Sequence, residues 1–189
     1  MQVITYNHKL LESAIDCLAS KIRRGEGKLT YIVAIMQGGA YIGRSFRFYF
    51  PEAQYHEITI SRPSRIKGKL FRWMVQNLPQ WLLDQLRKLE LKMQQLKRNV
   101  AEPQRIGEVD LEISPKPGDI ILLLDDAIDT GATINKARKQ ILEKYPDVKI
   151  RIACITMTTD APICEADYTL YHNQTLCRFP WSLDYHSKE

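Results

Sequence analysis

Ile121-Leu-Leu-Leu-Asp-Asp-Ala-Ile-Asp-Thr-Gly-Ala-Thr133 is the stretch of sequence that decides the fold. The apolar run 120–124 has the length of a strand and predicts one that is buried on both faces. The residues from Ile134 to Tyr145 predict a helix, which begins at about Thr133 or Ile134. Strands that alternate with helices are typical of an α/β protein with a mainly parallel sheet. Ligands of such sheets bind beyond the carboxyl ends of the strands, so we expect a site directly after Leu124.

The polar residues of this stretch favour a ligand that has both an anionic part and hydroxyl groups. A turn with one glycine and two threonines before a helix presents N–H groups and hydroxyls to one spot, where the helix dipole favours an anion. Gly131 lets the backbone come close to such a ligand. Asp125 and Asp126 would repel a phosphate, so they should face sugar hydroxyls or Mg²⁺. The loop lacks the lysine of a Walker A motif, which argues against a nucleoside triphosphate site.

One ligand, 5-phosphoribosyl-1-pyrophosphate (PRPP), carries all of these parts. The stretch 121–133 closely resembles the PRPP-binding motif of the type I phosphoribosyltransferases, which is a hydrophobic strand, an acidic pair and a Thr/Gly-rich loop. The resemblance implies that family's α/β fold, a mainly parallel sheet flanked by helices with a C-terminal hood. We therefore expect one phosphoribosyltransferase-like domain over residues 1–189, with a helical basic insertion at about 63–105 and a hood at about 160–189.

The resemblance also implies roles for individual residues. In the family, a ring nitrogen displaces pyrophosphate from ribose C1, with Mg²⁺ as cofactor. Asp125 and Asp126 are then expected to contact the ribose, and Asp129 is the catalytic residue that accepts a proton from the incoming base or holds that base. Gln37 to Gly39 correspond to the pyrophosphate loop, although Gln37 carries no charge. The residues predicted to bind PRPP are Asp125, Asp126, Asp129, Thr130, Gly131, Ala132, Thr133, Gln37, Gly38 and Gly39.

The C-terminal part resembles most closely the purine-type enzymes, which act on hypoxanthine, guanine or xanthine. The similarity lies in Ala166-Asp-Tyr168, Phe179-Pro-Trp181 and Leu183-Asp-Tyr185. It implies that Phe179 and Trp181 line a base pocket and that Asp184 is a metal ligand; packing of these side chains on the core is the alternative. The sequence departs from the purine pattern at two places. Thr158 and Thr159 stand where those enzymes usually have a lysine, and Leu176 or Cys177 where they have an aromatic residue.

Two functions agree with these features. The first is a phosphoribosyltransferase that transfers the phosphoribosyl group of PRPP to a purine-like nucleobase with release of pyrophosphate. The second is a PRPP-binding regulatory or adaptor protein with little turnover. Gln37, Thr158 and the non-aromatic Leu176 and Cys177 favour the regulator, whereas the intact Asp129 favours the enzyme.

The remaining elements follow from local patterns. Apolar residues at helical spacing predict a first helix from about Asn7, its N-cap, to Arg24, ended by Gly25 and Gly27. A short helix through Phe46 or Phe48 should follow the Gly-Gly turn and end before Pro51. Apolar or alternating runs predict strands at 31–36, 55–60, 107–113, 149–157 and 168–171.

Composition is ordinary for a globular protein, with 44% hydrophobic and 26% charged residues. No apolar run approaches the ~20 residues that cross a bilayer, and no secretory signal is visible. The four cysteines form no Cys-x-x-Cys pair or zinc-type cluster, so we expect reduced thiols and a cytoplasmic location.

The net charge of +5 is unevenly distributed. Residues 62–105 contain 11 basic and 3 acidic residues, a local charge of +8, and the rest of the chain carries −3. Within this segment Leu82, Leu86, Leu89, Met93, Leu96 and Val100 form a heptad stripe. We favour a helical insert that packs on its own chain or forms a contact in a homodimer or higher homo-oligomer. A basic face for nucleic acid, with Trp73 and Trp81 as stacking residues, and an interfacial membrane helix are the other two interpretations.

Overall fold

The computed structural model describes residues 2–60, 82, 85, 109–172, 175–182 and 185. Its main sheet has six strands in the order β3-β2-β4-β6-β5, with β7 paired to β6 on its other side, and all of these pairings are parallel. The strands are β2 (Tyr31–Ile35), β3 (Gln54–Ile58), β4 (Ile120–Leu124), β5 (Ala127–Ile128), β6 (Lys149–Met157) and β7 (Tyr168–His172). The predicted α/β class with a mainly parallel sheet is confirmed.

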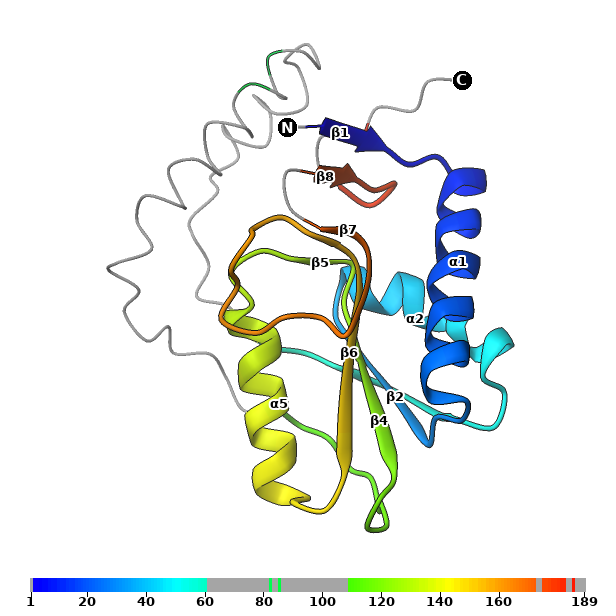
Figure 1. The fold of residues 1–189 in the computed structure, drawn as a ribbon, viewed down its shortest axis with the longest axis vertical. Coiled ribbons are helices and arrows are strands. Elements are labelled where there is room, and N and C mark those ends of the chain that lie inside the picture. Colours follow the sequence, from blue (N-terminus) through cyan, green and yellow to red (C-terminus); the bar gives the residue numbers. More distant parts are fainter. Residues whose placement is uncertain are drawn as a thin grey trace.

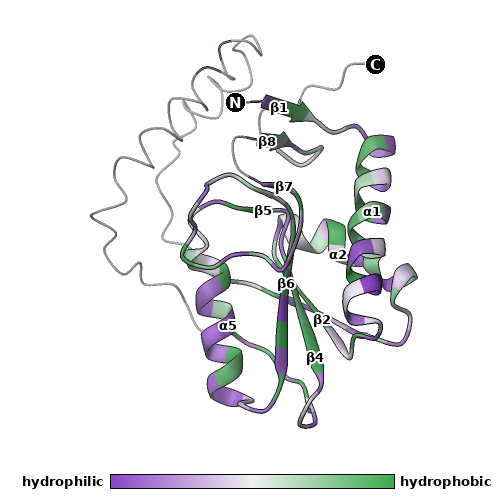
Figure 2. Cartoon of the chain, in the orientation of Figure 1, coloured by the Kyte–Doolittle hydropathy of each residue, from purple (hydrophilic) through white to green (hydrophobic). Residues whose placement is uncertain are grey.

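Helices cover both faces of this sheet (Figure 1). The helices α1 (His8–Glu26) and α2 (Gly38–Tyr49) pack on one face, and α5 (Ala132–Lys144) packs on the other. The side chains of β2 are buried throughout, as are those of Ile121–Leu124 in β4, because each of these strands has a helix layer on both sides. Figure 2 shows the same division, with hydrophobic central strands and helices that turn hydrophilic residues outward.

A second, two-stranded sheet joins the two ends of the chain. Strand β1 (Gln2–Thr5) pairs in parallel with β8 (Thr175–Arg178), and Figure 1 shows this pair above the carboxyl ends of the main strands. The side chain of Arg178 is buried and donates a hydrogen bond to the hydroxyl of Thr5 at 3.1 Å. The small sheet thus depends on residues from both ends of the sequence.

Most predicted elements are present with small shifts of their ends. The Asn7 side chain caps α1 by accepting from the Leu10 N–H at 2.8 Å, as predicted. Gly25 lies inside this helix, and Gly27, with φ 71°, ends it. The α2 helix ends at Tyr49, before Pro51, and β4 and β6 have the predicted bounds.

The strand predicted at 107–113 is wrong for residues 109–113, which pair with no strand. The alternating apolar side chains still pack against the core, because Leu111 is buried against α5 and Val109 and Ile113 are partly buried. Side chains of α5 and its end satisfy the backbone instead of a neighbouring strand. Gln140 accepts from the Val109 N–H, Lys144 donates to the Leu111 carbonyl, and Tyr145 donates to the Ile113 carbonyl.

Two of the sequence-based expectations fall on residues outside this description. The insertion at about 63–105 falls outside the described residues except for 82 and 85, and so does Asp184. All four cysteines are described and are free thiols, with Cys17 exposed and the others buried. No helix among the described residues is long and apolar enough to cross a membrane.

Candidate functional site

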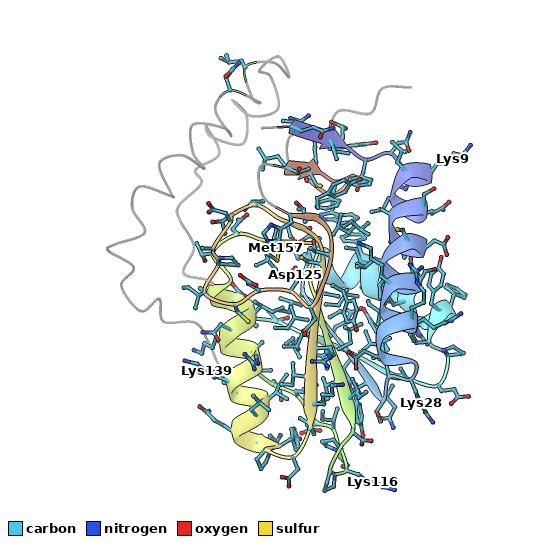
Figure 3. All side chains as sticks on the ribbon, in the orientation of Figure 1. Lys9, Lys28, Lys116, Asp125, Lys139 and Met157 are labelled. Atoms are coloured by element: carbon cyan, nitrogen blue, oxygen red, sulfur yellow. The ribbon has the colours of Figure 1, made fainter. Side chains whose placement is uncertain are left out.

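The acidic pair lies at a break in the main sheet. Strand β4 ends at Leu124, Asp125 and Asp126 leave the ladder, and β5 resumes the pairing with β6 at Ala127. The Asp126 carbonyl accepts from the N–H groups of both Ile155 and Thr156, at 3.1 and 3.4 Å. The Asp125 N–H donates to the Ala153 carbonyl at 3.1 Å, so the acidic pair stays attached to β6. Figure 3 labels Asp125 and Met157, which both lie toward this end of the sheet.

The two carboxylates of the pair have different surroundings. Asp125 is only 5% exposed, and one of its carboxylate oxygens accepts from the Asp126 N–H at 2.9 Å. Asp126 is half-buried, and its Oδ1 accepts from the Ala127 N–H at 2.9 Å. Its Oδ2 accepts from the indole Nε1–H of Trp181 at 2.8 Å. The carboxylate of Asp126 is therefore oriented by its own loop and by the C-terminal segment.

The Gly-Gly loop lies directly against this pair. A Cβ atom on Gly38 would stand 2.0 Å from the Asp126 carboxylate, and one on Gly39 would stand 2.4 Å from the Leu124 carbonyl oxygen. Only glycine permits this approach of the loop between β2 and α2 to the end of β4. Gln37 is exposed, and the peptide bond between Met36 and Gln37 is cis. The structure thus brings the predicted pyrophosphate loop and the acidic pair together.

The Thr/Gly turn forms the start of α5. Gly131 precedes the helix with φ 76°, and a Cβ there would stand 2.7 Å from the Cys164 carbonyl oxygen. The Thr130 carbonyl accepts from the Ile163 N–H at 2.8 Å, which ties the turn to the loop after β6. The Ala132 N–H donates to the Thr130 hydroxyl at 3.4 Å, and the N–H groups that follow it in the first turn of α5, from Thr133 onward, are oriented for an anion.

Asp129 projects from the same loop and is exposed. Its Oδ1 accepts from the Thr158 hydroxyl at 2.7 Å, and Thr158 itself is 4% exposed. The Thr158 N–H donates to the Ile128 carbonyl, which places the hydroxyl beside the carboxylate. Sequence reasoning identified Thr158 only as a departure from the purine pattern, whereas the structure places it on the predicted catalytic carboxylate.

Four aromatic rings form a continuous stack beside the acidic pair. Trp181 lies between Tyr41 of α2 and Phe179, with ring centroids 4.7 and 4.9 Å away and interplanar angles of 3° and 5°. Phe179 stacks in turn on Tyr6 at 5.4 Å. Phe179 is buried, whereas Tyr41 is 51% exposed at the outer end of the stack. No sequence pattern pointed to Tyr6 or Tyr41, because both depend on contacts between distant segments.

The residues that precede the aromatic pair offer no reactive group. Leu176 and Cys177 are buried in β8. Burial raises the pKa of the Cys177 thiol to about 12, so it stays protonated near neutral pH.

Asp184, the predicted metal ligand, lies outside the described residues. Within the described part of the chain, no group of three or more His, Cys, Asp or Glu could hold a metal ion without help from a ligand.

A model of the phosphoribosyl transferase domain family matches residues 4–168 of the sequence. The chain belongs to this family. It is accordingly a phosphoribosyltransferase, an enzyme of the glycosyltransferase class, as the motif at 121–133 predicted. A comparison of the sequence with curated proteins finds no match.

Solved structures show the same fold for this phosphoribosyltransferase. A purine phosphoribosyltransferase from Pyrococcus horikoshii is 16% identical, with a TM-score of 0.65 over 100% of this chain and 99% of the other. A Helicobacter pylori xanthine-guanine-hypoxanthine phosphoribosyltransferase is 15% identical, with a TM-score of 0.65 over 97% and 96%. A hypothetical protein from Neisseria gonorrhoeae with bound ppGpp is 16% identical, with a TM-score of 0.63 over 96% and 89%. The predicted type I fold and its likeness to purine-type enzymes are confirmed.

Proposed function

We propose that this phosphoribosyltransferase transfers the 5-phosphoribosyl group of PRPP to a purine-like nucleobase, with Mg²⁺ as cofactor and with release of pyrophosphate. One observation carries the proposal. The Gly38–Gly39 loop, the Asp125–Asp126 pair, Asp129 and the start of α5 converge at one edge of the sheet. That edge offers separate places for a phosphate, a diol and a leaving pyrophosphate, which are the three parts of PRPP.

Each part of PRPP has a partner of suitable chemistry. The turn Thr130–Thr133 and the first N–H groups of α5 suit the 5-phosphate, because they combine donors with the positive end of the helix dipole. Asp125 and Asp126 suit the ribose hydroxyls, since a carboxylate only accepts hydrogen bonds. The Gln37–Gly39 backbone suits the pyrophosphate, because its two glycines bring this loop against the acidic pair that would hold Mg²⁺.

Asp129 is proposed as the catalytic residue. Its carboxylate is exposed, so a bound base can reach it, and among the described residues Thr158 donates to Oδ1. Oδ2 is the oxygen proposed to accept a proton from the incoming ring nitrogen or to hold the base in line with ribose C1. The positive charge that develops on the sugar would also be stabilised by the nearby carboxylates.

The acidic pair also fits Mg²⁺, provided that the ligand supplies most of the coordination. Mg²⁺ favours oxygen ligands and is commonly held by one or two carboxylates together with substrate phosphates. Asp125 and Asp126 offer such oxygens beside the proposed pyrophosphate loop. The ion would neutralise charge on the departing pyrophosphate. Asp184 stays a predicted further ligand.

The proposed base pocket borders Phe179 and Trp181. Tyr41 covers the outer face of Trp181 and is itself half exposed, so a purine could stack there by taking the place of Tyr41. A purine acceptor agrees with the names of the Pyrococcus and Helicobacter enzymes. The ppGpp bound to the Neisseria protein shows that a structure similar to this chain can hold a guanine nucleotide with pyrophosphate groups.

A pyrophosphate-release assay tests the proposal. The full chain is incubated with PRPP, Mg²⁺ and, separately, hypoxanthine, guanine, xanthine, adenine and several pyrimidines. We expect release with at least one purine and none without a base or after removal of Mg²⁺ by a chelator. If PRPP binds measurably but no base causes release of pyrophosphate, the result supports a PRPP-binding regulator and contradicts the proposed transferase activity. A cytoplasmic location, a homo-oligomer and a nucleic-acid role for residues 63–105 stay predictions.

A further inference from the structure

The side chain of Trp181 has two separate kinds of contact. Its polar edge donates to Asp126 Oδ2 at 2.8 Å, and its two faces lie against Tyr41 and Phe179. The indole therefore connects three segments of the chain: helix α2, the break between β4 and β5, and the segment after β8. A side chain that only filled the core would not need its N–H to reach a carboxylate of the site.

The indole is held in this orientation by the stack and by its own turn. Phe179 and Tyr6 extend the stack inward, and Phe179 is 3% exposed. The Phe179 N–H donates to the Ser182 hydroxyl at 3.0 Å, and the Ser182 N–H returns a bond to the Phe179 carbonyl at 2.9 Å. Because ring and turn are both fixed, the direction of the indole N–H is fixed as well.

The carboxylate that receives this N–H has little freedom left. The Ala127 N–H holds Oδ1 of Asp126, Trp181 holds Oδ2, and the backbone of Gly38 lies against the carboxylate. Removal of the indole N–H would leave Oδ2 without this donor and would allow the carboxylate to rotate about its side-chain bonds. A hydrogen bond to a charged group contributes more than one between neutral groups, so the orientation should depend on it.

We propose that Trp181 is a positioning residue that holds the Asp126 carboxylate in the orientation that binds PRPP. The proposal rests on the proposed function of Asp126 as a ribose contact. It is separate from the predicted role of the Trp181 face in the base pocket, because it concerns only the N–H edge. It predicts that loss of the N–H weakens PRPP binding while affinity for the base is kept.

The substitution Trp181→Phe removes the N–H donor and keeps a smaller aromatic ring in the stack. We expect PRPP, measured by isothermal titration with Mg²⁺ present, to bind about tenfold more weakly. Tyr41→Phe is the matched control, because it keeps the stack and removes a hydroxyl at its outer end; PRPP binding should be unchanged. Equal PRPP affinity of W181F and the wild type would overturn the proposal.

A double-mutant cycle with Asp126→Asn tests whether Trp181 acts through this carboxylate. In the D126N background, W181F should weaken PRPP binding by less than about twofold. An undiminished effect there would overturn the proposal. All titrations are made below the melting temperature of each variant, so that a loss of folded protein is not mistaken for a loss of affinity.

A second measurement tests the hydrogen bond between Trp181 and Asp126 directly, without relying on a change in PRPP affinity. In protein labelled with ¹⁵N-tryptophan, the chain's three tryptophans give three indole N–H resonances, and W181F identifies that of Trp181. The chemical shift of this resonance should change in D126N and on addition of PRPP with Mg²⁺. An unchanged chemical shift in D126N would refute the hydrogen bond between Trp181 and Asp126. Absence of PRPP binding to the wild-type protein would instead refute the proposed function, so the two failures are distinguishable.

Discussion

Three aspartates of one loop have three different surroundings, and this difference separates their proposed roles. Asp125 is buried, Asp126 is held on both oxygens, and Asp129 is exposed and accepts a hydrogen bond from Thr158 at Oδ1. A carboxylate that is held in place suits binding, whereas one that is accessible to a substrate suits proton transfer. The residue type alone does not distinguish these roles.

Asp129→Asn should reduce kcat by about 10²- to 10⁴-fold, because the amide cannot accept a proton from the base. PRPP affinity should change less than about threefold, since the ribose and phosphate contacts are kept. Steady-state kinetics and PRPP titration on the same preparation measure the two effects. Unchanged turnover would show that Asp129 is not the catalytic residue.

Thr158→Val should lower kcat by about tenfold, because it removes the hydroxyl that orients Asp129 while it keeps the shape of a buried side chain. Thr158→Ser keeps the hydroxyl and serves as the matched control, with kcat within about twofold of the wild type. Equal kcat in Thr158→Val and the wild type would rule out the positioning role.

At the scale of elements, the site depends on how closely three segments approach one another. The loop between β2 and α2 touches the end of β4, and the turn before α5 touches the loop after β6. Each approach occurs at a glycine, Gly39 in the first and Gly131 in the second. The positions of the segment ends, rather than any one side chain, therefore set the distance between the proposed pyrophosphate and phosphate subsites.

Gly39→Ala should weaken PRPP binding by about tenfold or more, because its Cβ would meet the Leu124 carbonyl at 2.4 Å and the Asp125 Cα at 3.0 Å. Gly118→Ala is the control, since Gly118 has φ 85° and open space around it. We expect that variant to lose about 1 kcal/mol of stability without a change in PRPP affinity. Calorimetric titration and thermal unfolding separate the two effects. Wild-type affinity in Gly39→Ala would mean that the loop tolerates displacement.

At the scale of the whole molecule, an ionic cluster ties the first helix to the sheet. Glu26, at the end of α1, accepts hydrogen bonds from Lys149 and Tyr168 at 2.9 and 2.8 Å and from Arg151. Its side chain is only 5% exposed. Burial alone would raise the pKa of Glu26, but these three hydrogen bonds outweigh it and lower the pKa to about 2.

Glu26→Gln should lower the free energy of unfolding by about 2–3 kcal/mol at neutral pH. The folded pKa lies below the unfolded value of 4.5, so the charged form stabilises the fold above that pH. This contribution should fall as the pH drops from about 4.5 to about 2, and the two proteins should converge there. Urea unfolding at several pH values measures it.

Glu52→Gln is the control for this prediction, because Glu52 pairs with Lys28 on the surface with 77% of its side chain exposed. A solvated pair of this kind should contribute less than about 1 kcal/mol at any pH. A pH-independent difference between Glu26→Gln and the wild type would contradict the role assigned to the cluster.

The sequence by itself determined the class of fold, the family and the loop that carries the candidate site. These depend on local patterns: β4 is a short apolar run buried by helices on both sides, and the acidic pair and the Thr/Gly turn follow it directly. The same reasoning was wrong at 109–113, where alternation alone does not supply a neighbouring strand and α5 side chains bind the backbone.

Only the tertiary structure decided which distant residues complete the site. The pairing of β1 with β8, the hydrogen bond between Trp181 and Asp126 and the stacking of Tyr41 on Trp181 each join segments that are far apart in the chain. Periodicity and capping report interactions within a few residues, and they contain no information about such contacts. The packing of the two chain ends over the carboxyl edge of the sheet brings these residues together, because that packing sets where each ring and each donor lies.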